Sequence, residues 1–195
     1  MKKDLAIFAK QIELLSKLPL RYLGDPILRY KCKQVPPSQI VSNKIQNLAK
    51  KLKSVLIKHR KITGGGRGLV ANQIGGKIRM GIVWPFGAKE PEIIINPEIT
   101  WRSKEKAIYH EICMSMLFIG IDVIRPYSVE ISYYDLNGTK HQKKLDPQTS
   151  RLIQHEIDHL DGIVNLDRGN IKSTTLIFDT DSKKFAKKFI LKKLD

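Results

Sequence analysis

Two histidines four residues apart, His155 and His159, are the side chains in this sequence best suited to bind a metal ion together. On a helix, positions i and i+4 lie on one face, so both imidazoles can reach one cation. Glu156 lies about 100° further around such a helix, where it can contact a metal-held water rather than complete the same ligand set. This spacing predicts a metal hydrolase with Glu156 as general base. The alternative is a polar helix in which the two histidines only pack or cap.

A catalytic site of this kind needs a third protein ligand and one open position. No histidine follows His159, and the aspartates beyond it stand at no spacing typical of a metal ligand. Upstream, Cys113 in "HEICMSM" follows a strand-like run, and its thiolate is a natural donor. Taken alone, a free cysteine is more commonly a small buried apolar residue. Both interpretations of Cys113 stay open at this point.

Composition is that of an ordinary globular protein with a large positive charge. The 35 Lys and Arg residues against 19 Asp and Glu give a net charge of +16, which attracts polyanions. The alternative is a well-solvated lysine surface, because no recognisable nucleic-acid-binding motif accompanies the charge. Two cysteines make no disulfide framework. No apolar run reaches the roughly 20 residues that span a bilayer, and charged residues interrupt the N-terminal segment, so we expect a cytoplasmic protein without a membrane segment.

The elements that must position these residues follow from hydrophobic periodicity. Apolar spacing predicts helices over 3–17 and 39–60, a helix from Asp146-Pro147 to Gly162, and a final basic helix over 181–195. Between them, short β-like runs are separated by turn signals, including the hairpin dipeptide Asn137-Gly138. The predicted runs are "IRMGIVW", "EIIINPEI", "AIYHEICMSM", "IDVIRP", "SVEISYYDL" and "KHQKKL".

This pattern predicts an α+β fold, with a mostly antiparallel sheet packed around the central helix that carries HEIDH. We see no repeat or linker, and expect one domain over 1–195. Residues 1–17 would form a helical extension of that domain, and 181–195 a basic C-terminal helix.

Three motifs together resemble those of the peptide deformylases. "GRGLVANQ" resembles the first motif of that family, G-x-G-L-A-A-x-Q. "EICMS" resembles the second, E-G-C-L-S, and "QHEIDHLDG" resembles the third, Q-H-E-x-D-H-L-x-G. They occur in the order of the family and at about its spacing, and the resemblance runs from roughly residue 18 to residue 167.

The resemblance implies a ligand set and a reaction. Cys113, His155 and His159 would hold one divalent metal ion, Fe(II) first, with zinc, nickel or cobalt as substitutes. Glu156 would take a proton from the attacking water and pass it to the leaving amine. The amide of Gln73 and the backbone N–H of Met114 would stabilise the oxyanion. The substrate would be the N-formyl-methionyl end of a nascent protein, and the products formate and a free amine.

The resemblance also implies roles for residues that approach the substrate. Gly66 and Gly68 would give a tight backbone close to it. The sequence departs from the family at Val70, where the motif has alanine, and at Ile112, where it has glycine. Gly120 stands where many members have a substrate-contacting arginine. Val70 would narrow the pocket floor, and Ile112 would fill space beside the metal at a position whose backbone a branched residue resists.

A further basic residue, Arg125, matches a commonly basic position of the family and would pair with Glu111. None of the departures removes a metal ligand, the base or the oxyanion amide.

Two other functions remain open on the sequence. The first is a different metal hydrolase, such as a peptidase, that uses the same base. The second is a catalytically weak deformylase-like protein that binds nascent chains or the ribosome through the basic helix 181–195, favoured by the +16 charge and Ile112. The sequence leaves the oligomeric state open.

Overall fold

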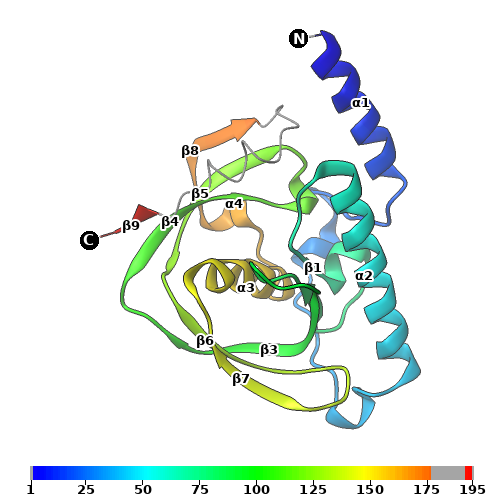
Figure 1. Cartoon of the computed structure of the whole chain (residues 1–195), viewed down its shortest axis with the longest axis vertical. Coiled ribbons are helices and arrows are strands. Elements are labelled where there is room, and N and C mark those ends of the chain that lie inside the picture. The colour runs from blue at the N-terminus through cyan, green and yellow to red at the C-terminus, as the bar shows by residue number, and fades with distance from the viewer. Residues whose placement is uncertain (1, 177–191, 195) are drawn as a thin grey trace.

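The computed structural model describes residues 2–176 and 192–194 and shows an α+β fold around one central helix (Figure 1). The α-helices are α1 (Lys2–Ser16), α2 (Asn43–Thr63), α3 (Pro147–Leu160) and α4 (Asn165–Arg168). Short 3-10 helices are η1 (Pro26–Arg29), η2 (Pro37–Gln39), η3 (Ala71–Ile74) and η4 (Met114–Met116). The strands are β1 (Gly68–Val70), β2 (Met80–Val83), β3 (Glu92–Arg102), β4 (Lys106–Ile112), β5 (Ile119–Pro126), β6 (Val129–Tyr134), β7 (Lys140–Lys144), β8 (Gly169–Leu176) and β9 (Lys192–Lys193).

These strands form two antiparallel sheets rather than one. Their orders are β1-β2-β3-β6-β7 and β8-β5-β4-β9. The predicted hairpin at Asn137-Gly138 is confirmed, because β6 pairs with β7 and Gly138 has the positive φ of +81° that such a turn needs. Asp135 tightens the turn by accepting the backbone N–H groups of Asn137 and Thr139. The predicted antiparallel character of the sheet is therefore confirmed.

Helix α3 lies between the sheets and is buried along nearly its whole length (Figure 1). Asp146 caps its start by accepting the N–H groups of Gln148 and Thr149, and Pro147 occupies its first turn. Its apolar side packs against the larger sheet. The hydrophobic cluster between α3 and this sheet contains Val83, Ile94, Val129, Ile131, Tyr133, Leu152, Ile153 and Ile157. The prediction of a central HExxH helix is confirmed, and it fixes both histidines inside the protein.

The second core cluster joins α2 to the edge of the larger sheet, and α1 packs beside α2 (Figure 1). Helix α2 begins at Asn43 rather than at residue 39, because Pro36 and Pro37 lead into the 3-10 turn η2. It ends at Gly64, which caps it in the left-handed conformation. Among the described residues, no helix is both long and apolar enough to cross a membrane.

Four local predictions were wrong or incomplete. Strands β1 and β8 were not expected, since neither carries a clear alternation of apolar residues. The run predicted as strand over 107–116 stops at Ile112, because the Cys113 sulfur accepts the Ser115 N–H and starts η4. The predicted helix over 181–195 lies mostly outside the described residues. At its end, Lys192–Lys193 form a strand that pairs with β4, so the helix is wrong there.

Candidate metal and catalytic site

The three residues expected to bind metal come together in the interior. The Cys113 sulfur and one nitrogen each from His155 and His159 lie within 4.8 Å of one another. Cys113 follows β4 directly, whereas both histidines lie on one face of α3. The Cys113 sulfur is 3.0 Å from Nε2 of His159. All three side chains are buried, which is the geometry that a Cys-His-His metal site requires.

The protonation of Cys113 suits a ligand. Burial alone would raise the pKa of its thiol, but His159 and His155 outweigh burial and bring the pKa down to about 5. The two histidines thus favour the thiolate of Cys113, which is the form that binds metals. The soft sulfur and two imidazoles fit several borderline divalent ions, Fe(II) and Zn(II) among them.

A chain of buried charges orients His155. Nδ1 of His155 is 2.9 Å from Oε2 of Glu111, which leaves Nε2 as the nitrogen available to a metal. Arg125 donates from two nitrogens to the two oxygens of Glu111, at 2.6 and 3.0 Å, as the sequence predicted. Arg125 also reaches Asp158 at 2.7 Å, and Arg168 binds the same carboxylate from its other side. Although burial raises the pKa of Glu111, Arg125 holds it well below its usual range.

Glu156 lies beside this site with one carboxylate oxygen unsatisfied. Oε2 has no hydrogen-bond partner among the described residues, although the side chain is only 3% exposed. Burial raises the pKa of this carboxyl group. A buried acceptor without a hydrogen-bond partner is costly, so Oε2 suits a site in which a bound water or substrate donates a hydrogen bond to it. Helix α3 presents it to the cavity next to Gly68, where any side chain would overlap Oε1 of Glu156.

Hydrogen bonds fix the orientation of the Gln73 side chain, which extends from η3 toward Cys113. Its Oε1 accepts the Val70 N–H at 2.9 Å, so its Nε2 points toward Cys113, 3.7 Å from the sulfur, and donates to Ser115 at 3.0 Å. Met114 is the first residue of η4. The first N–H groups of a helix have no partner within it, so this donor can serve an acceptor outside η4.

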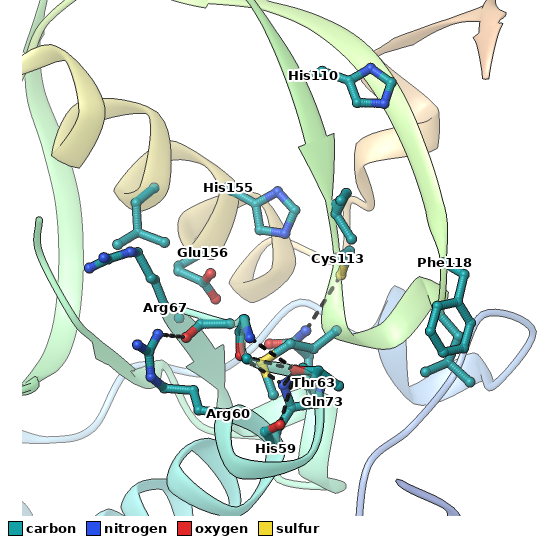
Figure 2. Close-up of a pocket in the computed structure, with 18 of the residues that line it drawn as sticks. His59, Arg60, Thr63, Arg67, Gln73, His110, Cys113, Phe118, His155 and Glu156 are labelled. Carbon is teal, nitrogen blue, oxygen red and sulfur yellow. Dashed lines mark hydrogen bonds between the residues drawn. The ribbon is translucent and has the colours of Figure 1, made fainter. Parts of the chain in front are cut away.

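One cavity of about 390 Å³ is lined by Gln73, Cys113, Met114, His155 and Glu156 (Figure 2), whereas the fully buried His159 does not line it. Gly66, Gly68 and Ile112, which were expected to approach the substrate, all line it. Residues that the sequence did not single out line it too. They are Phe8, Gln11, Leu15, His59, Arg60, Thr63, Arg67, Phe86, Tyr109, His110, Leu117, Phe118, Gln148, Arg151 and Leu152. Arg151 was recoverable from helix periodicity, since it precedes His155 by four residues. The sequence predicted the N-terminal helix but gave no signal that α1 would line the cavity.

Helix α1 forms one wall of this cavity. The rings of Phe8 and Phe118 are 4.2 Å apart between centroids, and Phe118 has an unusual positive φ of +63°. Gln11 donates to the carbonyl of Ile62 at 3.1 Å, and Leu15 is almost fully buried. Phe8 thus ties the N-terminal helix to the turn between β4 and β5, and Gln11 ties it to the end of α2.

Two expectations about the sequence departures were wrong. Val70 does not line the cavity: it packs with Cys32 and Leu160, and it pairs across the sheet with Gly81. Ile112 does line the cavity, but its backbone is ordinary strand rather than left-handed. Its partner across β5 is Gly120, so two of the departures stand opposite each other. In both pairs, a branched side chain faces a residue that has none.

A family model described as polypeptide deformylase matches residues 17–175, which span β1 to β7, the central helix α3 and the whole metal site. The chain belongs to the polypeptide deformylase family. The matched residues include the three proposed metal ligands and Glu156. The match begins after α1, so the helix that walls the cavity lies before the part that the family model describes.

Individual deformylases resemble the chain over most of its length. A peptide deformylase of Picosynechococcus sp. is 37% identical over 154 residues, which is 77% of this chain and 78% of the relative. A peptide deformylase of Bartonella tribocorum is 36% identical over 158 residues, 77% of this chain and 84% of the relative. The solved peptide deformylase from Synechococcus elongatus in complex with actinonin has a TM-score of 0.70 and 28% identity, and the match covers 89% of each chain.

Proposed function

We propose that this enzyme hydrolyses the formyl amide of N-formyl-methionyl peptides and releases formate and a free N-terminal amine. The observation that carries the proposal is the cluster of Cys113, His155 and His159, whose ligand atoms lie within 4.8 Å of one another at a cavity that Cys113, His155 and the unsatisfied carboxylate of Glu156 line. Membership of the deformylase family supports the same reaction. Of the deformylase and peptidase alternatives, the Cys-His-His set and Gln73 favour the deformylase.

Cys113, His155 and His159 would hold one divalent metal ion, and we propose Fe(II), with zinc, nickel or cobalt able to replace it. When bound, such an ion supplies Lewis acidity to a carbonyl oxygen and lowers the pKa of water. The buried thiolate and the Glu111-oriented His155 fit an ion of this class. The ion itself is to be identified by metal analysis of protein purified without oxygen.

Glu156 would act as the proton carrier of the reaction. Its carboxylate takes a proton from the attacking water, the new C–O bond forms at the formyl carbon, and the C–N bond then breaks. The same carboxyl group delivers the proton to the leaving nitrogen. A carboxyl group whose pKa is raised by burial holds and returns a proton more readily than an exposed one.

Gln73 and Met114 would stabilise the charge that develops on the formyl oxygen. The Gln73 amide is already aimed at Cys113 by its bonds to Val70 and Ser115, so it need not reorganise during the reaction. The Met114 N–H, at the start of η4, gives a second donor on the same side. Gly66, Gly68 and Ile112 would contact the peptide, since all three line the cavity.

The test is formate release from formyl-Met-Ala-Ser by anaerobically prepared protein loaded with iron or nickel. Glu156→Gln should lower kcat by about 10²- to 10⁴-fold while the metal content stays at that of the unaltered chain. Unformylated Met-Ala-Ser should stay intact, and its cleavage would favour the peptidase alternative. Metal-loaded protein that releases no formate would overturn the proposal and favour a binding function.

We further propose that the enzyme acts in the cytoplasm, on nascent chains that leave the ribosome. The net charge of +16 supports an electrostatic attraction to ribosomal RNA, and Lys192 and Lys193 are exposed. The segment 181–195 would supply the contact. Co-sedimentation with ribosomes should weaken with salt and on removal of 181–195, and a truncated chain that pellets equally well would disprove this contact.

A further inference from the structure

Three arginines from separate elements line the catalytic cavity. Arg60 comes from the end of α2, Arg67 precedes β1, and Arg151 lies in α3 one turn before His155. Arg60 and Arg67 lie on one side of the pocket, and Phe118 lies on the opposite side (Figure 2). Each of the three is partly buried, so each has given up part of its hydration.

Neutral groups hold two of these guanidinium groups in place. Arg67 donates through one terminal nitrogen to the carbonyls of Trp84, at 3.1 Å, and Pro85, at 3.3 Å. Its guanidinium carbon lies 3.8 Å from the ring centroid of Phe86. Arg60 donates to the Gly66 carbonyl and lies 4.7 Å from the ring centroid of Trp84. These contacts fix position and direction, but they bring no negative charge.

The three arginines together carry more positive charge than their one neighbouring carboxylate in the described chain, Glu156, can balance. Within residues 2–176 and 192–194, none of the three forms a salt bridge, whereas Arg79, Arg125 and Arg168 all do. The only acidic side chain that lines the cavity in this part of the chain is Glu156. Burial lowers the pKa of Arg67, and the positive charges of Arg60 and Arg151 lower it further.

A partly desolvated cationic group without a counter-ion favours an anionic ligand. Within the described chain, both hydrogen bonds of the Arg67 guanidinium use the same terminal nitrogen. Its planar fork matches a carboxylate. A formyl group placed at Glu156 and Cys113 leaves the following residues of the peptide within the same cavity. The neighbouring arginines would therefore meet side chains close to the N-terminus of the substrate.

We propose that Arg67, Arg151 and Arg60 bind a carboxylate of the substrate, so that the enzyme prefers formyl-methionyl peptides with Asp or Glu directly after the methionine. This inference rests on the proposed deformylase function. The arginines act as specificity residues and take no part in proton transfer. Because a hydrogen bond to a charged group is stronger than a neutral one, we expect a preference of about tenfold or more in kcat/KM.

The test compares formyl-Met-Glu-Ser, formyl-Met-Gln-Ser and formyl-Met-Lys-Ser, all with C-terminal amides, on nickel-loaded enzyme. The peptides formyl-Met-Ala-Glu and formyl-Met-Ala-Gln, also amidated, test whether the preference extends to the second residue after the methionine. We expect kcat/KM to be highest for the Glu peptide, lower for the Gln peptide and lowest for the Lys peptide. In Arg67→Gln and Arg151→Gln, the ratio of Glu to Gln peptides should fall toward 1, and Arg67→Lys should give an intermediate ratio.

A matched control separates the cluster from the overall charge of the protein. Arg102 is exposed at the end of β3 and does not line the cavity. Arg102→Gln removes the same charge and should leave the ratio unchanged. If it lowers the ratio as much as Arg67→Gln, the preference comes from the net charge and the proposal is wrong.

Two further outcomes would overturn the inference in different ways. Equal kcat/KM for the Glu and Gln peptides would disprove the side-chain preference while leaving the deformylase function intact. Free-acid peptides that are preferred regardless of sequence would show that the arginines bind the chain end of a short peptide instead. No formate from any peptide would count against the proposed function itself.

Discussion

At the residue scale, the position of Glu156 depends on the absence of a side chain at residue 68. Gly68 lies on β1 with Glu156 directly against its α-carbon, and its φ is not in the left-handed region. Its role is therefore close packing rather than backbone freedom. The sequence motif suggested a glycine that approaches substrate, and the structure adds that this glycine also makes room for the proposed base.

Replacing Gly68 with alanine should thus displace the Glu156 carboxylate. We expect Gly68→Ala to lower kcat by about 10²-fold or more, near the effect of losing general-base catalysis. Metal content should stay unchanged, since the three atoms nearest to a Cβ at residue 68 all belong to Glu156 rather than to a proposed metal ligand. Formate release, metal analysis and circular dichroism would check this. Full activity in a folded, metal-loaded variant would show that Glu156 is not confined by Gly68.

At the element scale, the cross-strand pairs explain how the chain accommodates its branched residues. Val70 on β1 pairs with Gly81 on β2, and a Cβ at Gly81 would lie 2.6 Å from Cγ1 of Val70. Ile112 on β4 likewise pairs with Gly120 on β5. Because direct partners project on the same face of a sheet, a glycine opposite a branched residue supplies the space it needs.

A double-mutant cycle on β1 and β2 tests this compensation. Gly81→Ala should lower the free energy of unfolding by about 1–3 kcal/mol, the usual cost of overpacking a core. In a Val70→Ala background, the same change should cost much less, giving a coupling of at least about 0.5 kcal/mol. Urea denaturation of the four chains measures both effects. Costs that simply add would mean that Val70 and Gly81 do not compensate each other.

At the scale of the whole molecule, buried titratable groups decide how stability varies with pH. Burial lowers the pKa of His59 from 6.5 to about 4. The unfolded chain therefore binds a proton at His59 before the folded chain does, so stability is present above pH 6.5 and is lost as pH falls toward 4. Glu111 and Asp167 have lowered pKa values, and their contributions are lost only at lower pH.

Acid unfolding of a His59 variant checks this assignment. On the order of 3 kcal/mol of unfolding free energy is lost between pH 6.5 and 4 through His59. His59→Gln cannot take up this proton, so its stability should fall less over the same window. Urea unfolding at several pH values would give both curves. Parallel curves for the two proteins would show that His59 is not the group responsible.

The sequence alone determined the helix that carries HEIDH, its caps at Asp146 and Gly162, and the hairpin at Asn137-Gly138. These follow from local periodicity, capping and turn chemistry, which act over a few residues. The proposed ligand set of Cys113, His155 and His159 and the pairing of Arg125 with Glu111 came through the resemblance of the motifs. In each case the information lies in a short stretch of chain or in a recurring motif.

Only the tertiary structure decided which residues surround that ligand set. It brought α1 against the β4–β5 turn, set Val70 beside Gly81 rather than in the cavity, and gathered Arg60, Arg67 and Arg151 around one pocket. It also turned the end of the predicted C-terminal helix into β9. The physical reason is that these contacts join segments far apart in sequence, and their energy comes from packing and charge that no local pattern records.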